Sequence, residues 1–423
     1  MARFAQILNR IRRQPISFPI VRQRPSLSPF VFLRRRGGGD LPEPLNDARC
    51  TFYFKGRNAV WHAVKALKLT PQETILVPSY HCGADLDAII KTGAKVEFYR
   101  VDRSATIDLE HLQRSINANT RALFIIHYFG FADPRLTEVR AMCRAHNIRL
   151  VEDCAHAMYS KSNGESLGTL GDVSVFSLFK SLPVPHGGAV RVNDPSLTVE
   201  RPGTEPPAAE GFDMVHWSME AHLRAKLGIL GQAVNKITRL IRRFGGEPLH
   251  FAAKRFEKQA PCSATTTPPP PEGCNPHVTF DLATKDWSPS RLTALIARRL
   301  DHLRVKKRRR ENFQVLAGML RGSEHLEFLH SELPEGICPL GLPIIVNDAV
   351  GLHSFLQEHR VSSDLFWKTR HDKSPDDAFP DTAFLTTHVV MLPIHQEVGE
   401  KALRQMASLV RQWGNQTQTA ALA

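Results

Sequence analysis

The chain has 423 residues, of which 42% are hydrophobic and 23% are charged, a composition typical of a globular protein with two or three domains. Its formal net charge is +13, and no run approaches the roughly 18 apolar residues that a membrane-spanning helix requires. The seven cysteines form no Cys-x-x-Cys pair, so we expect neither a metal site nor a disulfide framework, and a reducing, cytoplasmic location.

The positive charge is concentrated in two segments. Residues 1–39 contain many arginines and no acidic residue, and residues 298–310 form a second basic cluster. Such charge can attract nucleic acid or anionic lipid, but the chain contains no recognisable nucleic-acid-binding module. We therefore interpret both segments as solvated surface. We treat residues 1–46 as a basic N-terminal extension, whose apolar stretches are too short for a secretory signal.

Between residues 49 and 194, short apolar runs alternate with helical patterns. This alternation predicts βαβ units around a mostly parallel sheet, and continuous apolar runs are typical of strands that are buried on both faces. The expected strands are 74–78, 95–101, 121–129, 148–154, 173–179 and 188–192, and the expected helices are 56–69, 83–94, 109–116 and 136–147.

The alternation stops at residues 197–276, a basic insertion. Residues 223–244 place apolar residues at helical spacing on one face and basic residues elsewhere, which predicts an amphipathic helix. We expect its apolar face to pack on protein, with contact to a membrane surface as the alternative. Residues 263–273, SATTTPPPPEG, are typical of a stiff linker.

The rest of the sequence predicts a smaller α+β domain. Residues 288–316 indicate one long helix that begins at Ser288-Pro289. Strands at 341–346 and 389–394 and helices at 350–359 and 399–413 follow, and the last ten residues are typical of a frayed tail. The predicted boundaries are 47–285 for a large domain that includes the insertion, 286–417 for the small domain and 418–423 for the tail.

Lys180 stands out because it lies in an otherwise apolar stretch, FSLFKSLPVPHGGAV (176–190). A buried ammonium group loses hydration, so Lys180 either reaches the surface or a carboxylate, or serves as a desolvated amine nucleophile. Asp153 and His156 follow a buried strand in VEDCAHA, and open α/β sheets bind ligands at the carboxyl ends of their strands. Asp153 could hold a protonated ring nitrogen, and His156 could reach a second polar atom of the same ligand.

Two further features suit a phosphate group. Gly56-Arg57-Asn58 opens a helix, whose free N–H groups favour an anion, although an ordinary glycine at a helix start has the same appearance. Ser177 offers another hydrogen bond close to Lys180. A phosphate site, an acid for a ring nitrogen and a lysine amine are together what pyridoxal 5'-phosphate requires.

Seven stretches, taken in chain order, resemble the landmark motifs of the DegT/DnrJ/EryC1/StrS family of sugar aminotransferases. They are GRNAVWHAV, VPSYHCGADLDAIIKTGA, VDRSATIDLEHL, FIIHYFG, VEDCAHA, GDVSVFSLFK and HGGAVRVND. Seven motifs in the family's order are a specific signal. The resemblance implies an α/β, fold type I PLP-dependent transferase, with a mostly parallel seven-stranded sheet in the large domain. It also implies a homodimer whose active sites lie at the subunit interface.

The resemblance assigns roles to individual residues. Lys180 would form the Schiff base with pyridoxal 5'-phosphate, and Asp153 would bind its pyridine nitrogen. His156 would lie beside the ring oxygen, and Ser177 would hold the phosphate together with the Gly56–Asn58 turn. The implied reaction transfers an amino group, with glutamate as the donor, to a keto-sugar nucleotide in polysaccharide or amino-sugar biosynthesis.

The chain departs from the family pattern at several positions. The aromatic residue that stacks on the cofactor ring aligns with Cys82, which leaves Tyr80 or His81 as the stacking group, or none. His186 replaces the usual acid before the double glycine. A cross-subunit asparagine has no clear counterpart, and we expect Lys285 or a near neighbour to approach the partner's phosphate in its place.

Three other functions are alternatives. A non-catalytic regulator on the same fold would account for the altered Cys82 and His186. A PLP-dependent sugar dehydratase would keep the cofactor, but relatives of that kind have histidine in place of Lys180. Ser177-Leu-Phe-Lys180 and Lys91-Thr92-Gly93 match parts of the penicillin-binding signature, but in reverse order and without its third motif.

Overall fold

The computed structural model of the protein describes residues 20–33, 40–207, 210–211, 214–216, 218–223, 279–368, 370–375 and 378–422. The helix expected at 223–244 and the linker expected at 263–273 lie outside the described residues, apart from Leu223. Within the described part of the chain, no helix is both long and apolar enough to cross a membrane.

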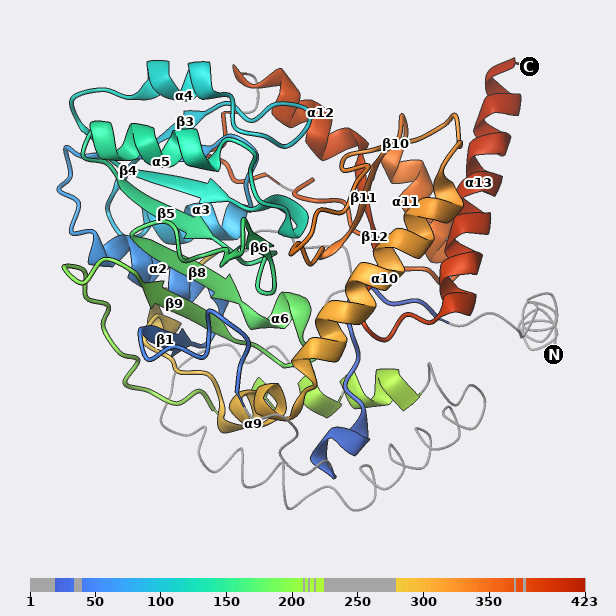
Figure 1. Cartoon of the computed structure of the whole chain (residues 1–423), viewed down its shortest axis with the longest axis horizontal. Coiled ribbons are helices and arrows are strands. Elements are labelled where there is room, and N and C mark those ends of the chain that lie inside the picture. Colours follow the sequence, from blue (N-terminus) through green and yellow to red (C-terminus); the bar gives the residue numbers. More distant parts are fainter. Residues whose placement is uncertain are drawn as a thin grey trace, which may run out of the picture.

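A seven-stranded sheet forms the first domain, as expected, with the strand order β1-β9-β8-β5-β4-β2-β3 (Figure 1). Every neighbouring pair from β8 to β3 is parallel, whereas β9 runs antiparallel to both β8 and β1. The strands are β1 (Cys50–Tyr53), β2 (Thr74–Pro78), β3 (Lys95–Tyr99), β4 (Thr120–Ile126), β5 (Arg149–Asp153), β8 (Val173–Ser177) and β9 (Gly188–Val192). The short β1 was not anticipated, because a four-residue segment is too short to stand out as a pattern of its own.

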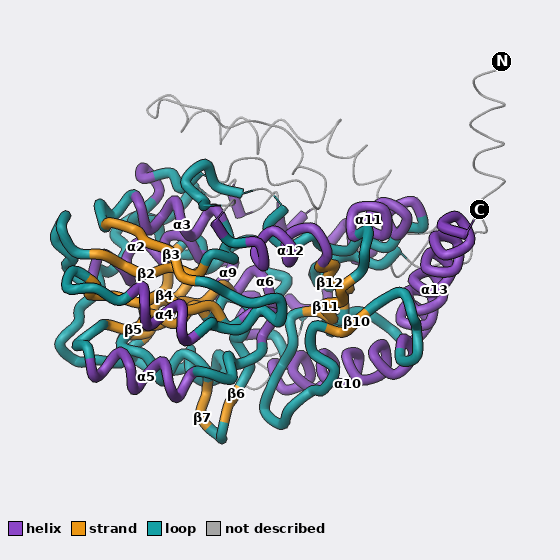
Figure 2. Tube along the Cα trace, turned by 90° about the horizontal axis from the view of Figure 1, so that it is seen from above, coloured by secondary structure: helices purple, strands orange, loops and turns teal. Residues whose placement is uncertain are grey.

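Helices cover both faces of this sheet, and Figure 2 shows α3 and α5 on opposite sides of it. They are α2 (Gly56–Ala66), α3 (Gly83–Ile90), α4 (Leu109–Ser115) and α5 (Leu136–Ala145), close to the expected ranges. In α5, Leu136, Val139 and Cys143 are buried at spacings of three and four residues, so one face of the helix packs on the sheet. Burial on both faces explains the continuous apolar runs of the strands.

The second domain is α+β, as expected. Its antiparallel sheet has the order β10-β11-β12, and its helices pack around this sheet (Figure 1). The elements are α10 (His302–Leu320), β10 (Glu327–Phe328), β11 (Gly341–Ile345), α11 (Ala349–Glu358), α12 (Pro380–His388), β12 (Val389–Pro393) and α13 (Glu400–Leu422). The prediction of a frayed tail from Gly414 is wrong as far as Leu422, because α13 continues through it.

The prediction of one long helix over 288–316 is also wrong. The segment forms two helices, α9 (Arg291–Arg299) and α10. Leu300 is extended, and the Asp301 side chain accepts a hydrogen bond from the Arg304 N–H, which caps a new helix. The first helix begins after Ser290, whose side chain accepts from the Thr293 N–H, rather than at Ser288-Pro289.

Part of the N-terminal extension packs on the folded domains. Leu27 is fully buried and Val21 nearly so. Val21 pairs in parallel with Val361, through hydrogen bonds from the Val21 N–H to the Arg360 carbonyl and from the Ser362 N–H to the Val21 carbonyl. Residues 20–33 are therefore joined to the chain segment that precedes Trp367.

Candidate active site

The sequence-predicted site residues converge at one edge of the large sheet. Strands β1, β2, β4, β5 and β8 point in the same direction, because β1 and β8 both run antiparallel to β9. Their carboxyl ends therefore share one edge. Asp153 ends β5, Ser177 ends β8, Gly56 begins the helix after β1, and Cys82 precedes the helix after β2.

Lys180 lies in α6 (Leu178–Ser181), a single helical turn that directly follows β8. Its Nζ is 2.8 Å from Nε2 of His156. The other ring nitrogen of His156 accepts a hydrogen bond from the Phe129 N–H (3.2 Å). Burial, and then the Lys180 charge, hold the pKa of His156 well below its usual range. Since Nδ1 is an acceptor, the neutral ring carries its proton on Nε2. This N–H can donate only to a lone pair, such as that of an uncharged Lys180 amine or of a ligand oxygen.

The second domain holds α6 in position. The Ser181 carbonyl accepts hydrogen bonds from an Nη atom of Arg309 (3.2 Å) and from the Gln396 amide (3.4 Å). Arg309 is 2% exposed, and its other Nη donates to the Leu340 carbonyl (2.9 Å). The turn that carries Lys180 is thus fixed from the side of α10 and not only by its own strand.

Asp153 is 3% exposed and accepts a hydrogen bond from the Ala155 N–H (2.7 Å). Burial is the main cause that raises its pKa to about 7, and the carboxyl of Asp85 adds to the rise, whereas Lys180 opposes it. Asp85 lies in the first turn of α3, and burial raises its pKa while Lys180 and Arg57 lower it. The site therefore contains a second carboxyl group, Asp85, which sequence reasoning missed.

Gly56 and Ser177 meet at the start of α2. A Cβ at Gly56 would lie 3.3 Å from Ser177 Cβ and 3.4 Å from its hydroxyl oxygen, so only glycine leaves this space open. The next strand also requires a glycine here, because a Cβ at Gly188 would lie 2.2 Å from the Lys55 carbonyl oxygen. The double glycine lets β9 pass directly against the turn that opens α2.

Arg57 and Asn58 take different positions in this turn. Arg57 is half-buried and donates to the Thr279 carbonyl (3.3 Å), and burial lowers its pKa. Asn58 is fully buried, and its amide donates to the carbonyls of Thr284 (2.6 Å) and Lys285 (3.2 Å). The Asn58 side chain therefore anchors the segment around Lys285, which leaves backbone groups of the turn to face an anion.

Neither aromatic candidate next to Cys82 faces the site freely. Tyr80 is fully buried, and its hydroxyl contacts the Phe366 carbonyl (3.5 Å). His81 is 2% exposed, stacks on Phe98, and has its Nε2 3.3 Å from the Ser374 hydroxyl. Cys82 itself is half-buried, and burial raises the pKa of its thiol to about 11.

Two aromatic residues of the second domain reach the site and were not foreseen. The Trp367 ring stacks on the His156 ring, with centroids 5.8 Å apart and an interplanar angle of 20°, and it packs edge-on against Tyr80 (4.6 Å). Phe366 packs edge-on against His156 at 5.1 Å. No sequence motif marks these residues as site residues, because they lie in an irregular segment far along the chain from Lys180.

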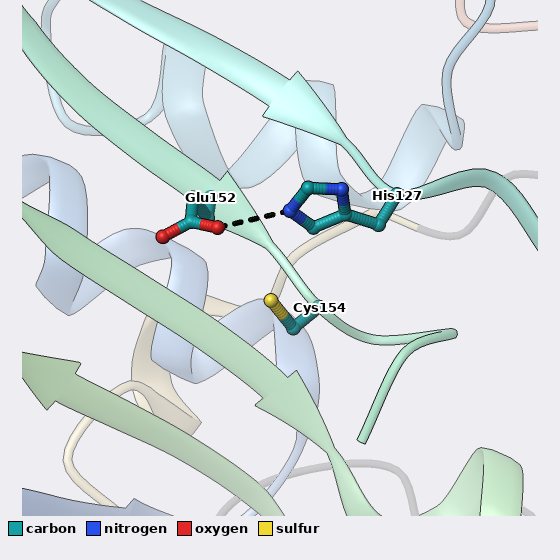
Figure 3. Close-up of side chains that lie close together, drawn as sticks. All are labelled: His127, Glu152 and Cys154. Carbon is teal, nitrogen blue, oxygen red and sulfur yellow. Dashed lines mark hydrogen bonds and ion pairs between the residues drawn. The ribbon is translucent and has the colours of Figure 1, made fainter. Parts of the chain in front are cut away.

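A buried pair supports the strand that carries Asp153. Figure 3 shows His127, Glu152 and Cys154 close together, with His127 Nε2 2.9 Å from a Glu152 oxygen. The same carboxylate accepts hydrogen bonds from three backbone N–H groups, those of Gly168 (3.1 Å), Leu170 (2.8 Å) and Gly171 (2.6 Å). With four donors around it, Glu152 anchors the connection between β5 and β8, and a metal ion would have to displace these bonds.

His186 and Lys285 are both engaged within the chain. His186 is buried, lies 4.3 Å from the Phe54 ring and has its Nδ1 3.3 Å from the Thr293 hydroxyl. Burial, and then Lys55, lower its pKa to about 4, so its ring is neutral. The Lys285 ammonium lies 5.1 Å above the Trp61 ring and pairs with Asp286.

The part of the chain that carries these residues is similar to known proteins. Residues 47–201, which contain every sequence-predicted site residue except Lys285, match the sequence profile described as the DegT/DnrJ/EryC1/StrS aminotransferase family. These residues belong to that family. The family resemblance inferred from the seven motifs is thereby confirmed. The match ends before the second domain, so Phe366 and Trp367 lie outside it.

Two curated relatives are similar over this part of the chain. GDP-perosamine synthase from Vibrio cholerae is 30% identical over 164 residues, which cover 38% of this chain and 44% of the relative. UDP-N-acetyl-3-dehydro-alpha-D-glucosamine 3-aminotransferase from Acidithiobacillus ferrooxidans is 31% identical over 128 residues, covering 30% and 34% respectively. The chain spans less than half the length of these relatives.

The fold similarity extends further than the sequence similarity. The solved structure of PseC from Helicobacter pylori, an aminotransferase involved in the biosynthesis of pseudoaminic acid, superposes with a TM-score of 0.62. The superposition covers 94% of this chain and all of PseC at 14% sequence identity. The predicted fold class, α/β with a mostly parallel seven-stranded sheet and a smaller α+β domain, is confirmed by this match.

Proposed function

We propose that this protein is an aminotransferase that uses pyridoxal 5'-phosphate to aminate a keto-sugar nucleotide. The observation that carries the proposal is the juxtaposition of Lys180 and His156 at 2.8 Å, with the buried Asp153 at the end of the neighbouring strand. An amine, a ring N–H donor and a carboxyl at one sheet edge are the groups that the cofactor's aldehyde, ring oxygen and ring nitrogen require.

The residues fit the cofactor. The space between Gly56 and Ser177, which a Cβ at position 56 would fill, suits a phosphate at a helix start. The Nε2–H of His156 suits an anionic ring oxygen. Asp153 is buried in surroundings that raise its pKa, so a cationic ring nitrogen would supply the positive charge that favours its carboxylate.

Each residue then has a chemical task. The bound cofactor supplies an electron sink for the substrate carbon that loses its proton. Lys180 would hold the cofactor covalently and, once displaced by an amino donor, would carry a proton to and from that carbon. Asp153 would keep the ring nitrogen protonated, and His156 would orient the ring by donating to its oxygen.

The substrate class rests on the relatives. The names of the two curated relatives contain a GDP-linked and a UDP-linked sugar, which supports a nucleotide-linked keto sugar as the acceptor and a role in polysaccharide or amino-sugar biosynthesis. We take glutamate as the amino donor. The described cysteines are all free thiols, which fits a reducing compartment such as the cytoplasm.

The test begins with the full-length protein and added pyridoxal 5'-phosphate. We expect a visible absorbance band that disappears on borohydride reduction and leaves the cofactor attached to the peptide that contains Lys180. Lys180→Arg should abolish this attachment, whereas Lys95→Arg, a change at an exposed lysine paired with Glu97, should not. Turnover is then measured with GDP-, UDP- and dTDP-linked keto sugars and glutamate. A wild-type protein that takes up no cofactor would overturn the proposal.

We further propose an obligate homodimer with Lys285 close to the partner's cofactor phosphate. Lys285 is half-buried and held at the surface of the α2 turn by its contacts to Trp61 and Asp286. Sedimentation at low micromolar concentration should show a dimer, and Lys285→Ala should weaken cofactor binding while leaving the dimer intact. A stable monomer that retains cofactor and full turnover would contradict both parts.

A further inference from the structure

Residues 361–368 and 370–375 of the second domain lie across the helix start at Ser79–Gly83. An Nη of Arg370 donates to the Ser79 carbonyl (2.8 Å), and the Thr382 hydroxyl donates to the Ser79 hydroxyl (2.7 Å). A Cβ at Gly83 would lie 3.5 Å from the Cβ of His371. The segment of the second domain therefore lies in van der Waals contact with the start of α3.

This segment carries Trp367 onto the candidate active site. Its ring is half-buried and contacts His156 and Tyr80, and it also packs edge-on against Tyr128 at 5.8 Å. The backbone of Trp367 has a φ of +56°, in the left-handed region that a bulky side chain seldom adopts. Such a conformation persists only where surrounding contacts hold it, and it is found most often at binding sites.

We propose that Trp367 forms the aromatic wall of the cofactor pocket, in place of the small side chain at position 82. This inference rests on the proposed function, since it names the surface against which a pyridine ring held by Lys180 and Asp153 would pack. Flat aromatic rings associate through offset stacking or edge-to-face contact. Tyr80 and His81 are buried behind the surface, whereas Trp367 is half-buried and lies against the histidine that contacts Lys180.

The consequence is that the second domain takes part in cofactor binding. In this arrangement Lys180, Asp153 and Ser177 come from the first domain, and the ring wall comes from a segment tied to β12 through Asp364, which pairs with Met391. Loss of the indole should therefore weaken cofactor binding without removing any group that bonds to the cofactor. Trp367 is in this sense a cofactor-binding residue.

The experiment is a titration of the cofactor-free, full-length protein with pyridoxal 5'-phosphate, followed by visible circular dichroism and tryptophan fluorescence. Trp367→Ala should raise the dissociation constant about tenfold and reduce the induced dichroism, while Trp367→Phe should restore most of both. Trp413→Phe, a change in α13 away from the site, serves as the control. Cofactor binding should quench part of the fluorescence in the wild type and in the control variant, and this part should be missing in Trp367→Phe.

The outcomes separate the two proposals. If the wild type does not bind the cofactor, the proposed function fails and this inference fails with it. If the wild type binds but both Trp367 variants bind with unchanged affinity, dichroism and quenching, only the assignment of Trp367 is overturned. Should Trp367→Ala not fold, as judged by thermal unfolding, the quenching in Trp367→Phe decides alone: its loss supports the assignment, and its retention overturns it.

Discussion

Replacing Asp153 with asparagine should make the cofactor-free protein more stable at alkaline pH while it removes catalytic function. The carboxyl is 3% exposed, and burial together with Asp85 raises its pKa from 3.8 to about 7. The folded protein thus holds this proton more tightly than the unfolded chain does. Stability therefore falls as the pH rises from about 4 to 7 and stays at its lower value above pH 7.

The size of the effect follows from the same values. A tenfold change in proton affinity corresponds to about 1.4 kcal/mol, so the ionised carboxyl costs at most about 4 kcal/mol of the free energy of unfolding. Since the charges of Asp85 and Lys180 act on Asp153 in opposite directions, we expect about half of this, a gain of about 2 kcal/mol for Asp153→Asn at pH 8 and less than about 1 kcal/mol at pH 5. In the cofactor-bound protein, a neutral amide stabilises a protonated ring nitrogen poorly, and turnover should fall by about 100-fold or more.

Urea unfolding of the cofactor-free variants at pH 5 and pH 8 measures the stability difference. Asp87→Asn is the matched control, because the pKa of Asp87 is shifted in the opposite direction from that of Asp153. Burial raises the pKa of Asp87, but hydrogen bonds from the Lys91 ammonium and the Phe280 N–H outweigh it and lower the pKa. Its stabilisation is present at pH 8 and is lost as the pH falls, so this variant should be less stable at pH 8. An Asp153→Asn variant with no gain at pH 8 would refute the reasoning.

Two further predictions concern the phosphate turn and the buried pair. Gly56→Ala should change the free energy of unfolding by less than about 1 kcal/mol, because the added Cβ would lie 3.3 Å from Ser177 Cβ. It should nevertheless abolish the preference for pyridoxal 5'-phosphate over pyridoxal in a binding titration. An unchanged preference would place the phosphate elsewhere. Glu152→Gln should lower the free energy of unfolding by about 2–4 kcal/mol, because the new amide group opposes N–H donors at a fully buried position, whereas Glu110→Gln at the surface should change little in the same urea titration.

Sequence reasoning was most successful where one physical pattern dominates. The run TILVP forms β2 at residues 74–78, as predicted, because a strand buried on both faces must be apolar throughout. Asp153 and Ser177 are found at strand ends because parallel topology brings those ends to one edge. The family motifs lie in this same part of the chain, so both lines of reasoning cover the same residues.

The remainder depends on contacts that no local pattern encodes. The apolar spacing of 288–316 continues through Leu300-Asp301, whereas the structure ends the first helix at the extended Leu300 and starts the next with the capping bond from Arg304 to Asp301. The Asp85 carboxyl acts on Asp153 from a different element of the sheet edge, so the residue spacing within its own helix does not predict this interaction. The contact between Trp367 and His156 joins two domains in a segment without regular structure.

The pairing of Val21 with Val361 has a practical bearing on how the protein is handled. The first 39 residues have the basic, acid-free composition of a segment that is commonly trimmed to improve expression. Trimming at Asp40 would remove the hydrogen bonds to Arg360 and Ser362, on the same stretch of chain that continues to Trp367. The loss would then appear as poor cofactor retention in a protein that still expresses and folds, so an inactive shortened version would be weak evidence against the proposed function.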